Sequence, residues 1–177
     1  MNYNPTLHKL SNGVTVILDP MDGMATTNVN VVFGTGSRDE SPSEYGLTHF
    51  CEHIICNGTT RFDSFRMIKD YVEDNGGEIG AATSNQYIRF YGEILSENTS
   101  VLLDVIADML FNSTLQKIEN ERTVILDELR RAQDNDNRRF INFLSDKIFD
   151  GAMNQYRTLG TEKNIMSFTR DQVQAHI

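Results

Sequence analysis

The sequence predicts an α+β fold in which a largely antiparallel sheet is flanked by helices. Short stretches with alternating apolar residues gather in two groups, before residue 34 and between residues 78 and 95. Segments with apolar residues at helical spacing follow each group instead of separating every pair of strands. The chain has 177 residues, of which 39% are hydrophobic, so it is long enough for one domain with its own core.

The first group of strands opens with a predicted hairpin. Residues 6–10 and 14–18 are strand-like and flank Asn12-Gly13, two residues that tolerate positive φ and favour a tight turn. A third strand is expected over residues 27–33, where apolar residues alternate. These segments supply one half of the predicted sheet.

The second group holds two strands, over residues 78–84 and 86–95. Helices are predicted around both groups from the spacing of apolar residues and from capping residues. They cover residues 46–56, 63–74, a segment capped by Ser96, 116–134, a segment around 140–148, and a last one opened by a capping box of Thr169 and Gln172. This order places the helices on one side of an antiparallel sheet.

Charge and cysteine content limit the function classes. Lys and Arg number 16 and Asp and Glu number 25, so the net charge is −9, which disfavours nucleic acid and anionic membranes and can attract basic ligands. The alternative is that the acidity only keeps the chain soluble. No apolar run approaches the ~20 residues of a membrane span. Cys51 and Cys56 lie five residues apart, so on a helix their thiols point to different sides. A disulfide framework is therefore not expected, and a reducing compartment fits better.

The main chemical signal is His49-Phe50-Cys51-Glu52-His53, within the first predicted helix. Residues i and i+4 of a helix lie on one face about 6 Å apart, so the two histidines can hold one zinc ion. Glu52 lies on the same side, where a carboxylate can take a proton from zinc-bound water and pass it to a leaving amine. The pattern reverses the commoner H-E-x-x-H motif. The alternative is two unrelated surface histidines.

A catalytic zinc site needs a third protein ligand and one open position. Glu121 and Glu128 lie seven residues apart, which is two helical turns, so they share a face of the helix over residues 116–134. A buried carboxylate needs a partner, and a metal ion is a good one. The alternative for both is a solvated helix face. The residues that predict partial burial of this helix are Ile118, Val124, Ile125 and Leu129.

Several segments together resemble the insulinase/pitrilysin family of zinc peptidases, which includes the mitochondrial processing peptidases. The most specific segment, residues 46–59, matches the family pattern G-L-x-H-F-x-E-H-x-x-x-x-G-T. Further matches follow in order along nearly the whole chain, at residues 10–16, 32–40, 76–81, 121–128 and 159–165. The resemblance implies one half of a clamshell peptidase fold. Residues 1–177 would then be a single zinc-bearing domain that is short of its last elements, with the second domain absent.

The resemblance also assigns roles to residues. It implies that His49, His53 and Glu128 bind Zn²⁺ and that Glu52 is the general base. It also implies that Glu121 orients the metal ligands without binding the metal itself. A substrate peptide would add as an extra strand along the edge of a strand of the sheet. The residues of that strand are Ile79, Gly80, Ala81, Ala82, Thr83 and Ser84.

Two features depart from the family pattern. Gly80 stands where the family usually has Asn, so a polar contact to the substrate or to the transition state is expected to be missing. Cys51 and Cys56 occupy positions that are usually apolar, and we interpret both as small buried hydrophobic residues. A nucleophilic role for Cys51 fits poorly, because side chains two residues apart on a helix point to different faces.

The predicted function is that of a zinc metalloendopeptidase acting on extended, basic peptides such as targeting presequences. A second related domain or subunit would supply further residues that hold the substrate. The alternative is a non-catalytic scaffold or partner subunit, against which the presence of all four site residues argues. A bacterial cytoplasm is the expected location and a mitochondrial matrix the alternative, with neither nucleic acid nor membrane as a partner.

Overall fold

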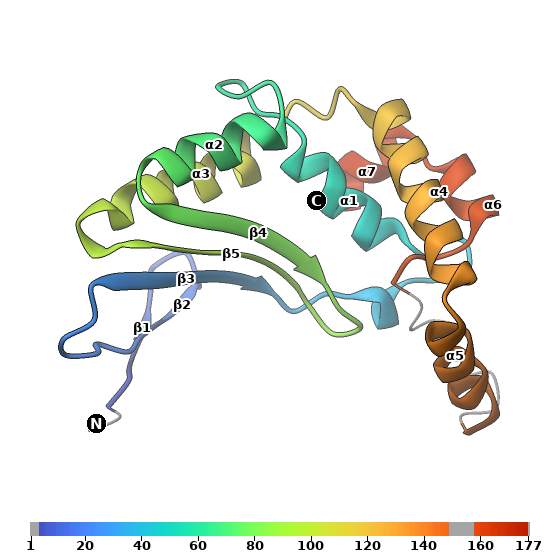
Figure 1. Cartoon of the computed structure of the whole chain (residues 1–177), viewed down its shortest axis with the longest axis horizontal. Helices are drawn as coiled ribbons and strands as arrows, with labels where there is room; N and C mark the ends of the chain where they lie inside the picture. Colours follow the sequence, from blue (N-terminus) through green and yellow to red (C-terminus); the bar gives the residue numbers. More distant parts are fainter. Residues whose placement is uncertain (1–3, 149–157, 177) are drawn as a thin grey trace.

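The computed structural model describes residues 4–148 and 158–176 and confirms the α+β class (Figure 1). Its elements are β1 (Thr6–Lys9), β2 (Thr15–Leu18), β3 (Thr26–Phe33), a 3-10 turn (Ser37–Asp39), α1 (Leu47–Cys56), α2 (Phe65–Asp74), β4 (Gly77–Thr83), β5 (Ile88–Leu95), a second 3-10 turn (Ser96–Asn98), α3 (Thr99–Asn112), α4 (Ile118–Asp134), α5 (Asp136–Ile148), α6 (Glu162–Ser167) and α7 (Arg170–His176).

The main sheet has the strand order β3-β5-β4, and both pairings are antiparallel. Helices α2 and α3 pack on one face of it (Figure 1). Alternate residues of β5 point toward these helices, as the alternation in the sequence predicted, and their partners on β3 and β4 complete the core. The order leaves β4 as an edge strand of the sheet within the described part of the chain.

The predicted N-terminal hairpin is present but forms a separate two-stranded sheet. Gly13 has φ +91°, and the Leu10 amide donates to the Val14 carbonyl oxygen at 2.9 Å. Within the described residues the hairpin does not pair with β3, and its apolar side chains are solvent-exposed, with Leu7 69% and Ile17 68% accessible. The expectation that these strands continue the main sheet therefore differs from the structure.

A second hydrophobic cluster lies beside the sheet and is formed by helices and the loops that connect them, such as Leu159 and Phe168. Helix α1 contributes to both clusters: Ile55 belongs to the sheet cluster, whereas Phe50 and Ile54 pack with α4, α6 and α7. Phe50 meets Phe168 edge to face, with ring centroids 5.5 Å apart. Helix α1 is therefore the element that joins the two parts of the molecule.

Three details correct the sequence-based expectations. Ser96 begins a 3-10 turn instead of capping a helix, and α3 starts only at Thr99. Val124 is 49% exposed, because it lies one residue away from the buried face of α4. Residues 162–167, for which no helix was predicted, form the short helix α6. The capping box is confirmed: the Gln172 amide donates to Thr169 Oγ1, and Gln172 Oε1 accepts from the Thr169 amide.

Candidate metal centre

The start of α1 is fixed by a buried carboxylate. Glu40 accepts hydrogen bonds from the amides of Gly46 and Thr48, each at 2.7 Å, so that a negative charge lies at the helix N-terminus. Burial raises the pKa of Glu40, and the two amide donors offset part of this effect. Gly46 has φ +95°, and a Cβ there would lie 2.9 Å from the Cα of Gly160, so both the backbone angle and the packing require glycine.

Three predicted ligands converge between α1 and α4. The Nε2 atoms of His49 and His53 each lie 3.6 Å from the same oxygen of Glu128, Oε2. One donor atom from each residue lies within 4.8 Å of the others. Tetrahedral zinc with ligand bonds of about 2.0–2.1 Å separates its ligands by roughly 3.4 Å. The donor set and its spacing therefore fit a zinc ion with one position left open.

Glu121 holds the second histidine in the orientation that a metal needs. Its carboxylate lies 3.0 Å from Nδ1 of His53, which leaves Nε2 directed toward Glu128, and it also accepts a hydrogen bond from the Asn57 amide group. Burial lowers the pKa of His53, but its hydrogen bonds to Glu121 and Glu128 outweigh this and raise it to about 9. The hydrogen bond from His53 keeps the pKa of Glu128 below its usual value.

His49 is in a different environment from His53. Burial, together with the neighbouring His53, lowers its pKa to about 4, so the ring is neutral and has a free lone pair at neutral pH. Its Nδ1 is buried and has no hydrogen-bond partner among the described residues. A neutral, buried imidazole is the form that binds a metal ion.

Glu52 stands next to this centre and is tied to the sheet. Thr83, at the end of β4, donates a hydrogen bond from Oγ1 to Glu52 Oε2. Burial raises the pKa of Glu52, and the hydrogen bond from Thr83 offsets part of the shift. A carboxylate with a raised pKa is a stronger base than an ordinary one, which suits a group that accepts a proton and returns it.

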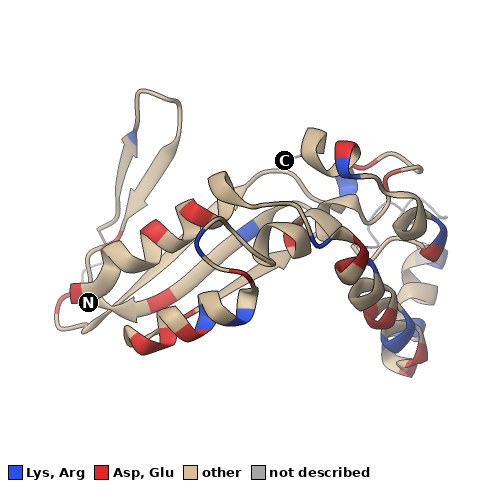
Figure 2. Ribbon diagram, turned by 90° about the horizontal axis from the view of Figure 1, so that it is seen from above, with Lys and Arg blue, Asp and Glu red and all other residues tan. Residues whose placement is uncertain are grey.

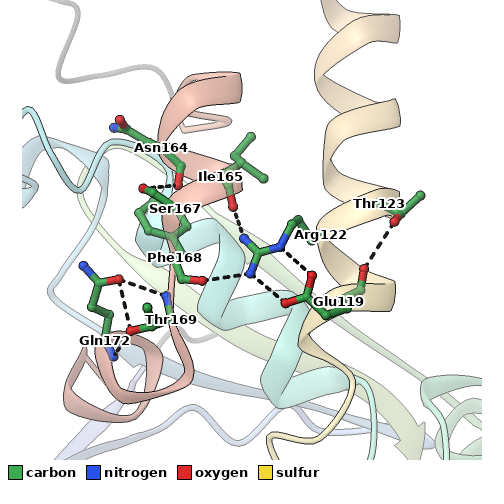
Figure 3. A network of polar contacts seen from close by, with 9 residues as sticks. All are labelled: Glu119, Arg122, Thr123, Asn164, Ile165, Ser167, Phe168, Thr169 and Gln172. Carbon is green, nitrogen blue, oxygen red and sulfur yellow. Dashed lines mark hydrogen bonds and ion pairs between the residues drawn. The ribbon is translucent and has the colours of Figure 1, made fainter.

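An arginine to which the sequence analysis gave no role anchors α4 behind the centre (Figure 3). The guanidinium of Arg122 donates to the carbonyl oxygens of Ile165 and Phe168, pairs with Glu119, and lies 5.5 Å from the centre of the Phe50 ring. It therefore connects α4 to α1 and to the segment around α6. Its place next to Glu121 in the family pattern and its spacing of three residues from Glu119 are visible in the sequence. The two carbonyl groups that it binds are not, because they lie 43 and 46 residues away.

The structure also places the remaining predicted residues. Residues 79–83 lie in the edge strand β4, whereas Ser84 follows it in the turn to β5. Cys51 and Cys56 are both free and buried, and they belong to the helical and the sheet cluster respectively, as their spacing predicted. The Cys51 thiol lies 3.9 Å from the Val173 carbonyl oxygen and has a pKa raised to about 12 by burial.

Comparison with known proteins decides the family. The family model described as insulinase, peptidase family M16, matches residues 15–162. The chain belongs to the insulinase family. It is 32% identical over 168 residues to an uncharacterized zinc protease, YmxG, of Bacillus subtilis, covering 94% of this chain and 41% of that protein. It is 34% identical over 170 residues to a probable mitochondrial-processing peptidase subunit beta of Arabidopsis thaliana, covering 95% of this chain and 32% of that protein.

The fold of this insulinase-family chain matches solved structures. It superimposes on a protease from Helicobacter pylori with a TM-score of 0.85 at 22% identity, covering 98% of this chain and 42% of that one. The chain thus spans less than half the length of the relatives that it matches. Within the described part of the chain, no helix combines the length and the hydropathy needed to cross a bilayer.

Proposed function

We propose that this chain carries the catalytic centre of a zinc-dependent endopeptidase, with His49, His53 and Glu128 as the metal ligands. The observation that carries the proposal is the convergence of both Nε2 atoms on one carboxylate oxygen at 3.6 Å, with Glu52 on the next turn of the same helix face. A zinc ion bound there would supply a Lewis acid that polarises the scissile carbonyl and makes water a stronger acid.

The protein's own groups would then move the protons. Glu52 takes a proton from the attacking water on a carboxylate oxygen and delivers it to the leaving amine, a transfer for which its raised pKa is suited. Thr83 holds that carboxylate at the end of β4, next to the place where the scissile bond must lie. Glu121 keeps His53 in the tautomer that presents Nε2 to the metal.

The substrate would be an extended peptide that pairs with the free edge of β4, from Ile79 toward Ser84. This strand is an edge strand within the described residues, and its last residue, Thr83, already contacts Glu52. Main-chain pairing binds many sequences, provided that the peptide is extended. It also delivers the peptide backbone to the metal centre at the end of the strand.

Basic peptides and a second related domain or subunit complete the proposal. The net charge of −9 favours basic substrates, although Figure 2 shows acidic residues spread over the helices with basic ones among them. Support for a second half comes from the length of the relatives. The chain aligns with only 41% of the Bacillus subtilis protein and 32% of the Arabidopsis thaliana protein, and the latter is named as a subunit. The relatives are named as a bacterial zinc protease and a mitochondrial processing peptidase, and we propose a bacterial cytoplasm before a mitochondrial matrix.

The direct test is the zinc content of the purified chain after exposure to zinc and removal of the excess. We expect about one zinc per chain, and loss or strong weakening in Glu128→Ala. Asp127→Ala is the matched control, because it removes a neighbouring carboxylate that is 53% exposed and pairs with Arg130. A folded chain that binds no zinc would refute the peptidase proposal and favour a non-catalytic scaffold.

A further inference from the structure

The face of the main sheet that points away from α2 and α3 carries opposite charges at its two ends. Ile79 and Phe90 belong to the core, so the residues that alternate with them point to this open face. At the end near Thr83, Arg89 lies opposite Ala82. The open-face residues of the two strands are Glu78, Gly80 and Ala82 on β4, and Arg89, Tyr91 and Glu93 on β5.

Tyr91 leans across β4 because its partner there is a glycine. Gly80 and Tyr91 are directly opposite in the register, and a Cβ at Gly80 would lie 2.9 Å from both Cζ and the hydroxyl oxygen of Tyr91. The phenol therefore occupies the space that a side chain at position 80 would fill. Since Ala82 is also small, the tip of Tyr91 lies close to the edge where a peptide would pair.

Arg89 stacks on this tyrosine and its charge is uncompensated. The guanidinium carbon lies 4.4 Å from the centre of the Tyr91 ring. Its Nε is buried without a hydrogen-bond partner, and no carboxylate within the described residues forms an ion pair with it. A half-buried guanidinium of this kind is a strong binding group for a carboxylate, which it can meet with two parallel hydrogen bonds.

The opposite end of the same face carries two negative charges without a partner. Glu78 and Glu93 are both exposed and lie directly opposite each other in the register. Like charges at directly opposed positions destabilise a sheet, and no cation of the described residues pairs with either carboxylate. A basic side chain on an added strand would relieve this repulsion.

We propose that this face is a specificity subsite that selects the charge pattern of the bound peptide. The Arg89–Tyr91 pair binds an acidic side chain near the metal centre, and the Glu78–Glu93 pair binds a basic side chain on the same face of the peptide. Glu78 and Ala82 are four residues apart on β4, so the two peptide side chains are also four residues apart, about 13 Å along the strand. The proposal rests on the proposed addition of substrate to β4.

Peptide binding to the zinc-loaded chain tests it, with Glu52→Gln introduced so that the peptide is not consumed. Three fluorescent, extended peptides of equal length are compared by anisotropy: one with Asp and Lys four residues apart, one with the two exchanged, and one with Gln at both places. Strand addition fixes the direction of the peptide, so only one of the two charged peptides can place Asp at Arg89 and Lys at Glu78. We expect that peptide to bind roughly threefold to tenfold tighter than the peptide with Gln at both places.

Variants of the sheet face assign this preference to its residues. Arg89→Leu is expected to remove the contribution of Asp, and Glu78→Gln that of Lys. Gly80→Ala displaces Tyr91 without changing any charge and is expected to lower the ratio of charged to neutral affinity. Arg66→Leu, a control on the exposed surface of α2, should leave the ratio unchanged.

The outcomes separate this proposal from the function on which it rests. If the unaltered sheet face binds none of the three peptides, strand addition to β4 is wrong and the subsite falls with it. If all three bind equally, strand addition stands and the subsite is refuted. A preference that survives Arg89→Leu and Glu78→Gln in folded protein also refutes it.

Discussion

At the scale of single residues, the candidate site depends on a carboxylate that does not touch the metal position. Glu121 lies 3.0 Å from His53 Nδ1 and raises the pKa of that histidine. Glu121→Gln keeps the shape but removes the charge, so we expect zinc affinity above pH 9, where His53 is neutral in both proteins, to fall by roughly tenfold or more. Competition with a chromogenic chelator measures it, and Asp127→Asn should leave the affinity unchanged.

Glu121 also controls the pH dependence of zinc binding. In the metal-free chain, His53 has a pKa of about 9, so below that pH a zinc ion must displace a proton from it. Zinc affinity should therefore rise with pH toward 9, and in Glu121→Gln the rise should end at lower pH. Calorimetry in buffers of different ionisation enthalpy counts the released protons. An affinity that is flat between pH 6 and 9 would contradict this assignment.

The sequence alone can predict those site residues whose spacing along one helix carries the information. His49, Glu52 and His53 share a helix face, and Glu128 follows from the family pattern, so the sequence is enough to propose all four. Arg122 and Glu40 could not be given roles, because the backbone groups that they bind reach them only in the folded chain. The position of Tyr91 over Gly80 could not be predicted either, because it depends on the register between β4 and β5.

At the scale of elements, the first turn of α1 decides where the ligands lie. Glu40 satisfies two amides of that turn, and a glutamine can accept only one while its amino group faces the other. Glu40→Gln is therefore expected to lower the free energy of unfolding by about 1–3 kcal/mol and to weaken zinc binding. Urea unfolding checks the first effect. Glu73→Gln, at an exposed position of α2, should change stability by about 0.5 kcal/mol or less.

The elements themselves were largely predictable, because apolar periodicity and turn residues are local properties. Asn12-Gly13 predicted its hairpin and Thr169 with Gln172 predicted the start of α7. Long-range contacts decided the rest. The hairpin is separate from the main sheet, and the phase of α4 turns Val124 outward although its neighbour Ile125 is fully buried.

At the scale of the whole molecule, the candidate site lies where two hydrophobic clusters meet. Helix α1 belongs to both, and α4, which carries Glu128, belongs to the helical one. A metal bound by His49, His53 and Glu128 would therefore cross-link α1 to α4 in the folded state only. Binding that is restricted to the folded state stabilises it by mass action.

Thermal unfolding should report this cross-link. At zinc concentrations about 100 times the Kd, the stabilisation is about 2.7 kcal/mol, which for a chain of this size raises Tm by roughly 5–10 °C. Glu128→Ala should abolish the rise, because it removes the ligand that α4 supplies. Glu52→Gln should preserve it, because Glu52 acts on protons and not as a ligand. If the zinc-dependent rise in Tm were lost in Glu52→Gln and kept in Glu128→Ala, Glu52 would be the ligand in place of Glu128. The metal would then be bound by α1 alone and would not link α1 to α4.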